Sequence, residues 1–180
     1  MIEDLNKIAA YATPVRPGDV EAIEAQLGRR PRGLVGIGAR CACGTPAVTI
    51  TRPRLSEGTP FPTLFYLTLP SVVYEMSRLE AGGFMAEMNA RLAADPLLAE
   101  AHHAAHADYL ERRRRLGDVA EIEDVSVGGM PDRVKCLHAL AAYSMSVGKG
   151  ICPIGDLALE AAAWDRAICN CRDASERQAK

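Results

Sequence analysis

Six cysteines carry much of the chemistry that this 180-residue chain can perform. Cys41 and Cys43 flank a single residue and precede a glycine, and Cys169 and Cys171 have the same spacing near the C-terminus. Thiolates on tight turns are typical ligands of zinc, which takes four of them in a tetrahedron, and of iron–sulfur clusters, which usually also take four. The pattern therefore predicts a thiolate metal site that holds zinc or an iron–sulfur cluster. A one-residue spacing is tighter than that of zinc ribbons and does not distinguish the two.

A second concentration of reactive side chains begins at position 128, where two glycines and a proline precede an acid, two cations, a thiol and an imidazole. Proline after such a turn is typical of a helix start, and we predict a helix over about 131–146. A thiol in its first turns, beside Arg133 and Lys135, should have a lowered pKa. Cys136 could therefore serve as a metal ligand or as a nucleophile, and we predict the ligand role.

His138 follows two residues later, which places it about 200° around an α-helix from Cys136. The two side chains then serve one site only if the helix starts late. Two alternatives stay open. Cys136 could be a buried structural thiol, since Leu140 lies on the same side of the helix. It could also be the nucleophile of an enzyme acting on a phosphorylated or thiol-reactive substrate, with His138 as acid/base. The candidate anion-binding residues of such an enzyme are Arg40, Arg133 and Lys135.

The elements that must position these residues are predicted from hydrophobic periodicity. Strands are expected over about 33–40, 47–52 and 63–69, with helical periodicity in most of the remainder. The glycines of the first strand indicate close backbone approach. We predict an α+β fold in which a small antiparallel three-stranded sheet packs against a mostly helical layer. The expected organisation is a single domain over 1–172 and a flexible tail over 173–180.

Composition excludes several classes of protein. The net charge of −2 argues against a general polyanion binder, so a nucleic-acid partner is not expected. No run of about 18 apolar residues is present, which predicts no transmembrane helix. The N-terminus is acidic and lacks a signal-peptide core, so we expect a cytoplasmic protein. In a reducing compartment, cysteines serve more often as thiols or metal ligands than as disulfides.

Five blocks of the sequence form a pattern in a fixed order. They occupy residues 40–46, 58–68, 77–80, 105–110 and 129–138. Together they resemble an uncharacterised bacterial family, domain of unknown function 501. This resemblance implies no reaction. Members are encoded near cell-division and exopolyphosphatase genes, which implies a non-catalytic protein partner in cell division or polyphosphate metabolism as a further alternative.

The resemblance also bears on the ligands. It supports Cys41, Lys135, Cys136 and His138 as motif positions. It implies a recurrent cysteine pair near the C-terminus, whereas relatives have asparagine at the position of Cys152. The predicted metal site therefore joins the hairpin, the helix and the C-terminal end through Cys41, Cys43, Cys136 and one of Cys169 or Cys171.

Overall fold

A three-stranded antiparallel sheet forms the base of the structure. The computed structural model describes residues 4–169 and residue 171. The strands pair in the order β1-β2-β3, and β2 is buried along its whole length. The strands are β1 (Leu34–Arg40), β2 (Pro46–Thr51) and β3 (Phe65–Leu67). The predicted strands are confirmed, although the third is shorter than expected.

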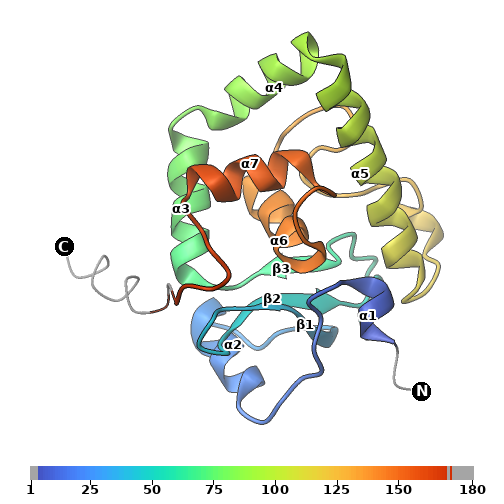
Figure 1. Cartoon of the computed structure of the whole chain (residues 1–180). Coiled ribbons are helices and arrows are strands. Elements are labelled where there is room, and N and C mark those ends of the chain that lie inside the picture. Colours follow the sequence, from blue (N-terminus) through green and yellow to red (C-terminus); the bar gives the residue numbers. More distant parts are fainter. Residues whose placement is uncertain (1–3, 170, 172–180) are drawn as a thin grey trace.

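Helices lie on both faces of this sheet. In Figure 1, α3, α4 and α5 run around α6 and α7 on one side, while α2 lies on the other. The described helices are α1 (Leu5–Ile8), α2 (Asp19–Leu27), α3 (Pro70–Ala81), α4 (Phe84–Ala94), α5 (Pro96–Arg114), the 3-10 turn η1 (Ala120–Ile122), α6 (Leu137–Val147) and α7 (Pro153–Ala161). This arrangement is the predicted α+β fold. The predicted tail over 173–180 lies outside the described residues. Within the described residues, no helix is long and apolar enough to span a membrane.

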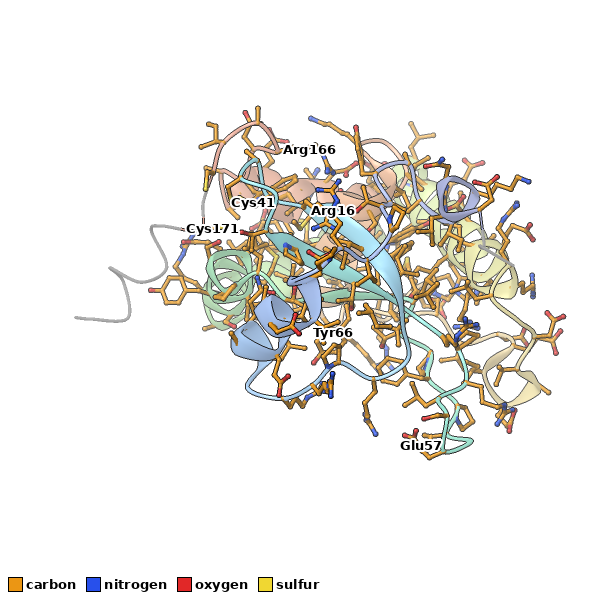
Figure 2. All side chains as sticks on the ribbon, turned by 90° about the horizontal axis from the view of Figure 1, so that it is seen from below. Arg16, Cys41, Glu57, Tyr66, Arg166 and Cys171 are labelled. Carbon is orange, nitrogen blue, oxygen red and sulfur yellow. The ribbon has the colours of Figure 1, made fainter. Side chains whose placement is uncertain are left out.

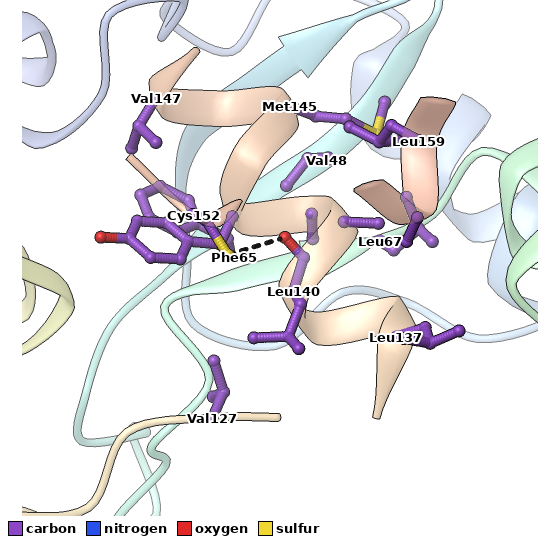
Figure 3. Packing of buried hydrophobic residues seen from close by; sticks show 14 of the residues in the cluster. Val48, Phe65, Leu67, Val127, Leu137, Leu140, Met145, Val147, Cys152 and Leu159 are labelled. Atoms are coloured by element: carbon purple, nitrogen blue, oxygen red, sulfur yellow. Dashed lines mark hydrogen bonds between the residues drawn. The ribbon is translucent and has the colours of Figure 1, made fainter. Parts of the chain in front are cut away.

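Helix α6 is the centre of the core. Every residue from Leu140 to Val147 is buried, and the helix packs on the sheet, on α3 and on α7. Two glycines permit this approach: a Cβ on Gly38 of β1 would lie 2.6 Å from the Ser146 hydroxyl, and one on Gly155 of α7 would overlap the Leu140 carbonyl. Figure 3 shows the apolar side chains gathered around α6. The glycine content of β1 thus reflects close packing, as predicted.

An aromatic trio joins the sheet to the helical layer. Phe65 of β3 lies 6.0 Å from Tyr109 of α5 and 5.8 Å from Tyr143 of α6, measured between ring centroids. The Tyr109 hydroxyl accepts a 2.6 Å hydrogen bond from the Leu64 backbone N–H, which satisfies its buried oxygen. These contacts fix α5 and α6 relative to the short strand β3.

Candidate metal centre

The turn between β1 and β2 presents two thiols. Cys41 directly follows β1, and its backbone N–H donates to the Thr45 carbonyl at 2.9 Å. Gly44 closes the turn by donating to the Cys41 carbonyl at 2.8 Å with a φ of 91°, a conformation that favours glycine. Because the chain reverses within these few residues, Cys41 and Cys43 lie on a tight loop with their sulfurs close together.

The C-terminal segment returns to this turn after α7. Its reversal includes Ala163, whose φ is 50°. Arg166 anchors the segment: its guanidinium lies 3.5 Å from the ring centroid of Tyr11 and donates to the Met145 carbonyl at the end of α6. Figure 2 shows Cys171 beside Cys41, although the two lie 130 positions apart in the sequence. Arg166 therefore places the last two cysteines against the hairpin.

Four sulfur atoms converge at this point. Those of Cys41, Cys43, Cys169 and Cys171 all lie within 4.8 Å of one another, and the Cys43 and Cys171 sulfurs are 3.5 Å apart. All four are free thiols; Cys41 is buried, while Cys43 and Cys169 are exposed. This group, called the four-cysteine cluster below, sits at the surface with one buried side and could hold a metal ion.

The thiols of the cluster differ in acidity. The Thr45 hydroxyl, 3.2 Å from the Cys43 sulfur, and the Thr45 backbone N–H lower the pKa of Cys43 to about 6. Burial, together with the neighbouring thiols of Cys41 and Cys43, raises the pKa of Cys171. One thiolate therefore forms readily, while repulsion at such short range makes ionisation of the other thiols unfavourable. A bound cation would make their ionisation favourable, because metals bind the thiolate form.

A second group of three potential ligands lies between α3 and α6. The Nδ1 of His138 is 3.1 Å from Oε1 of Glu80, and this oxygen also accepts a 2.7 Å hydrogen bond from the Leu137 backbone N–H. Cys136 is the N-cap residue of α6. One ligand atom each of Glu80, Cys136 and His138 lies within 4.8 Å of the other two. We call these residues the Glu-Cys-His group.

The late start of α6 brings this group together. The predicted helix over 131–146 is wrong at its N-terminal end, since α6 begins at Leu137. The preceding residues form a loop with a cis Met130–Pro131 bond, held by Asn89, which accepts from the Val134 N–H at 2.9 Å and donates to the Val134 carbonyl. Cys136 is extended, with φ −151° and ψ 110°. The helical offset of about 200° therefore does not apply, and Cys136 and His138 share one site.

Two members of the Glu-Cys-His group, Cys136 and His138, line an open groove. The groove has a volume of about 600 Å³, and its walls are mostly apolar. A hydrogen bond with Cys136, with the charge of Glu80 adding to it, raises the pKa of His138 to about 8 against the opposing effect of burial. The groove is lined chiefly by Leu27, Phe65, Leu67, Val73, Tyr74, Cys136 and His138. The thiol and imidazole are thus next to a space large enough for a small molecule.

The predicted metal ligands divide between the two groups. Cys41 and Cys43 meet both C-terminal cysteines, where one was expected, and Cys136 lies with Glu80 and His138 instead. The inclusion of Cys136 in the thiolate site is therefore corrected: its position at the N-cap of α6 directs it toward α3, away from the hairpin. Cys152 is fully buried and donates to the Leu140 carbonyl at 3.6 Å, outside both groups (Figure 3).

Arg40 has no N–H group left for the predicted anion-binding role. A guanidinium has five N–H donors, and all five of Arg40 are used inside the protein. Two bind the Asp19 carboxylate at 2.8 and 2.6 Å; the others reach the Thr13 hydroxyl and the carbonyls of Pro14 and Gly44. Arg40 instead supports the cysteine turn through Gly44. The pKa of Asp19 is lowered, mainly by its hydrogen bond with Arg40.

Arg133 and Lys135 are exposed on the loop before α6, and their anion-binding role stays a prediction. Sequence reasoning missed Glu80 as a member of the second group. One signal was present: an acid in the last turn of a helix faces the negative end of the helix dipole and requires a compensating partner. In α3 that partner is the N-terminus of α6, through the Leu137 N–H, together with His138.

Comparison with known proteins identifies a family that matches most of the chain. Residues 37–160 match the family described as "Protein of unknown function (DUF501)". No curated protein and no solved structure matches the chain significantly. The matched range includes the whole Glu-Cys-His group but ends before the C-terminal half of the four-cysteine cluster. Because the match covers more than half of the chain, the protein belongs to this family of unknown function, as the sequence blocks indicated.

Proposed function

We propose that the protein binds one zinc ion through Cys41, Cys43, Cys169 and Cys171, and that this ion fixes the C-terminal segment to the β1–β2 hairpin. The supporting observation is the convergence of four sulfurs from two distant segments within 4.8 Å. A closed set of four thiolates is the ligand set of structural zinc sites. The proposed setting is the cytoplasm, where such thiols remain reduced.

The spacing of the sulfurs favours a single ion over a cluster. Zinc–sulfur bonds of about 2.3 Å in a tetrahedron separate the sulfurs by about 3.8 Å. The sulfurs of Cys43 and Cys171 are 3.5 Å apart, and all four sulfurs lie within 4.8 Å of one another, which is close to this value. In an iron–sulfur cluster the four cysteines bind at least two different irons, which requires some of the sulfurs to lie farther apart. Small closing movements would therefore suffice for zinc.

Zinc would also resolve the electrostatic conflict of the free thiols. Four sulfurs this close cannot all ionise without a cation, and the raised pKa of Cys171 expresses this repulsion together with its burial. The low pKa of Cys43, about 6, supplies one thiolate at neutral pH as a first ligand. Each further bond to zinc then releases a proton.

The test is metal analysis of the full-length protein purified under reducing conditions. We expect about one zinc per chain that survives dialysis against a weak chelator, and a colourless sample. The double variant Cys43→Ser/Cys171→Ser should lose this zinc, whereas Cys152→Ser should retain it, because Cys152 is buried outside the cluster. A brown sample rich in iron would contradict zinc as the metal. A wild-type protein that holds no metal and takes up none would overturn the proposal.

A further inference from the structure

We propose that Glu80, Cys136 and His138 form a second metal site, which binds a divalent transition-metal ion such as zinc through three protein ligands. The fourth coordination position then faces the groove between α3 and β3. This site is independent of the four-cysteine cluster and does not require the function proposed for that cluster.

The hydrogen bonds of His138 set its tautomer. Its Nε2 lies 3.2 Å from the Val73 carbonyl and 3.1 Å from the Ser77 hydroxyl, and that hydroxyl donates to the same carbonyl at 3.0 Å. A carbonyl oxygen only accepts, so Nε2 carries a proton. The lone pair of a neutral imidazole is then on Nδ1, which faces Glu80. Histidine ligands of metals are typically oriented in this way, with the second ring nitrogen donating to a backbone carbonyl.

Three electron-pair donors therefore point toward one space. The Nδ1 of His138 and Oε1 of Glu80 are 3.1 Å apart, a separation suited to two ligands of one small cation. The thiol of Cys136 completes the group within 4.8 Å. A proton on the imidazole could satisfy Glu80 alone, whereas a metal ion uses all three donors. Nitrogen, sulfur and oxygen are all established zinc ligands.

The surrounding elements hold the donors in place. Glu80 is fixed by the Leu137 N–H at 2.7 Å. Cys136 is the N-cap residue of α6, so its position is set by the start of a core helix. The ligands thus come from the end of one helix and the start of another, on elements packed into the core. Such rigid support is what a metal site requires for fixed geometry.

The groove indicates what could reach the open position. Sites with three protein ligands keep one position for water or substrate and act as Lewis acids. In the described part of the chain, the groove lining contains no lysine or arginine, and Phe65, Leu67 and Tyr74 contribute apolar surface. Apart from the proposed metal ion, a phosphorylated ligand would find no lysine or arginine side chain there to balance its charge. The groove fits a small, largely apolar molecule that offers an oxygen donor to the metal.

The test is titration of the zinc-loaded, dialysed protein with cobalt(II), which reports a sulfur ligand by thiolate-to-metal charge-transfer absorption. We expect one further equivalent to bind with such a band. Cys136→Ser should abolish the band, and Glu80→Gln and His138→Gln should weaken binding by at least about a hundredfold. Serine is a favoured N-cap residue and glutamine can still accept from the Leu137 N–H, so these variants should fold.

The matched control is Cys152→Ser, since Cys152 is also a helix N-cap cysteine but lies outside both groups. This variant should bind cobalt at the Glu-Cys-His group normally. The double variant Cys43→Ser/Cys171→Ser should also bind cobalt there, although its cluster has lost zinc, which separates failure of this site from failure of the cluster. Absence of a second equivalent in the wild type, or its persistence in Cys136→Ser, would overturn the proposal. So would rapid alkylation of Cys136 that depends on His138 but is unaffected by metal, which would identify a thiol–imidazole pair.

Discussion

The four-cysteine cluster and the Glu-Cys-His group are built in opposite ways. The cluster joins two surface segments, a hairpin turn and the chain after α7, and the side chains that could bind a metal are all thiols. The Glu-Cys-His group joins two helices that pack in the core, and it combines three ligand types beside a groove. Four identical soft ligands close a site, whereas three mixed ligands leave a position for chemistry. The comparison suggests a structural role for the first and a reactive role for the second.

The largest effect is expected from Arg40→Met, which removes the support of the cysteine turn. Arg40 and Asp19 are nearly buried, with side chains 10% and 8% exposed. Leaving Asp19 unpaired should lower the free energy of unfolding by about 3–5 kcal/mol. Urea denaturation measures this change. Zinc retention by the cluster should fall, while the Glu-Cys-His group should keep its metal; equal losses at both sites would contradict their independence.

Lowering the pH should remove the contribution of the Arg40–Asp19 ion pair to the free energy of unfolding. The pKa of Asp19 is held below its ordinary value of 3.8 by Arg40, so its contribution to stability is present above the unfolded-state pKa. That contribution is lost as the pH falls through the lower, folded-state pKa. Arg40→Met should therefore show a smaller loss of stability between neutral pH and pH 3 than the wild type, measured by urea denaturation across this range.

Zinc removal from the cluster should have the next largest effect. With free zinc about a hundredfold above its dissociation constant, binding to the folded state alone contributes about 2.7 kcal/mol. A strong chelator should remove this contribution and make the segment between α7 and Cys171 sensitive to protease, because that segment would lose its proposed metal link to the hairpin. Unchanged stability and protection would argue against a structural role. Cys43→Ser/Cys171→Ser serves as the control, since it should not respond to the chelator.

Arg166→Gln tests the anchor that returns the C-terminal segment. The substitution removes the stacking on Tyr11 and weakens the contact with the Met145 carbonyl. We expect a loss of about 1–2 kcal/mol in the free energy of unfolding. Zinc should also leave the cluster faster, as followed with a chromophoric chelator. Cobalt binding at the Glu-Cys-His group should be unchanged, and a change there would show that the two sites are coupled.

The smallest effect is expected from Cys136→Ser in metal-free protein. Serine at an N-cap accepts from the N–H groups of the first turn, so α6 should gain about 0.5 kcal/mol of stability. Thermal denaturation in chelator measures this gain. In cobalt-loaded protein the sign should reverse, because the variant loses a ligand. A destabilised metal-free variant would indicate that the Cys136 thiol is needed for packing.

Local sequence determined much of this molecule. The β-branched residues over 48–51 predict β2, and Gly44 marks the turn that carries Cys41 and Cys43, because strand and turn preferences act over a few residues. The α+β class and the three strands follow from the same short-range patterns. Glycines of β1 likewise indicated a close approach, although not the helix that makes it.

The tertiary structure determines which of the candidate metal-binding side chains lie close together. Pro131 is a typical helix-start residue, yet α6 begins only at Leu137, because Asn89 of α4 holds the preceding loop at Val134. That shift, set by a contact far along the chain, brings Cys136 and His138 together. Glu80 joins them only because α3 packs against α6. Spacing in the sequence could identify the thiols and the imidazole, but their grouping depends on long-range contacts that no local pattern contains.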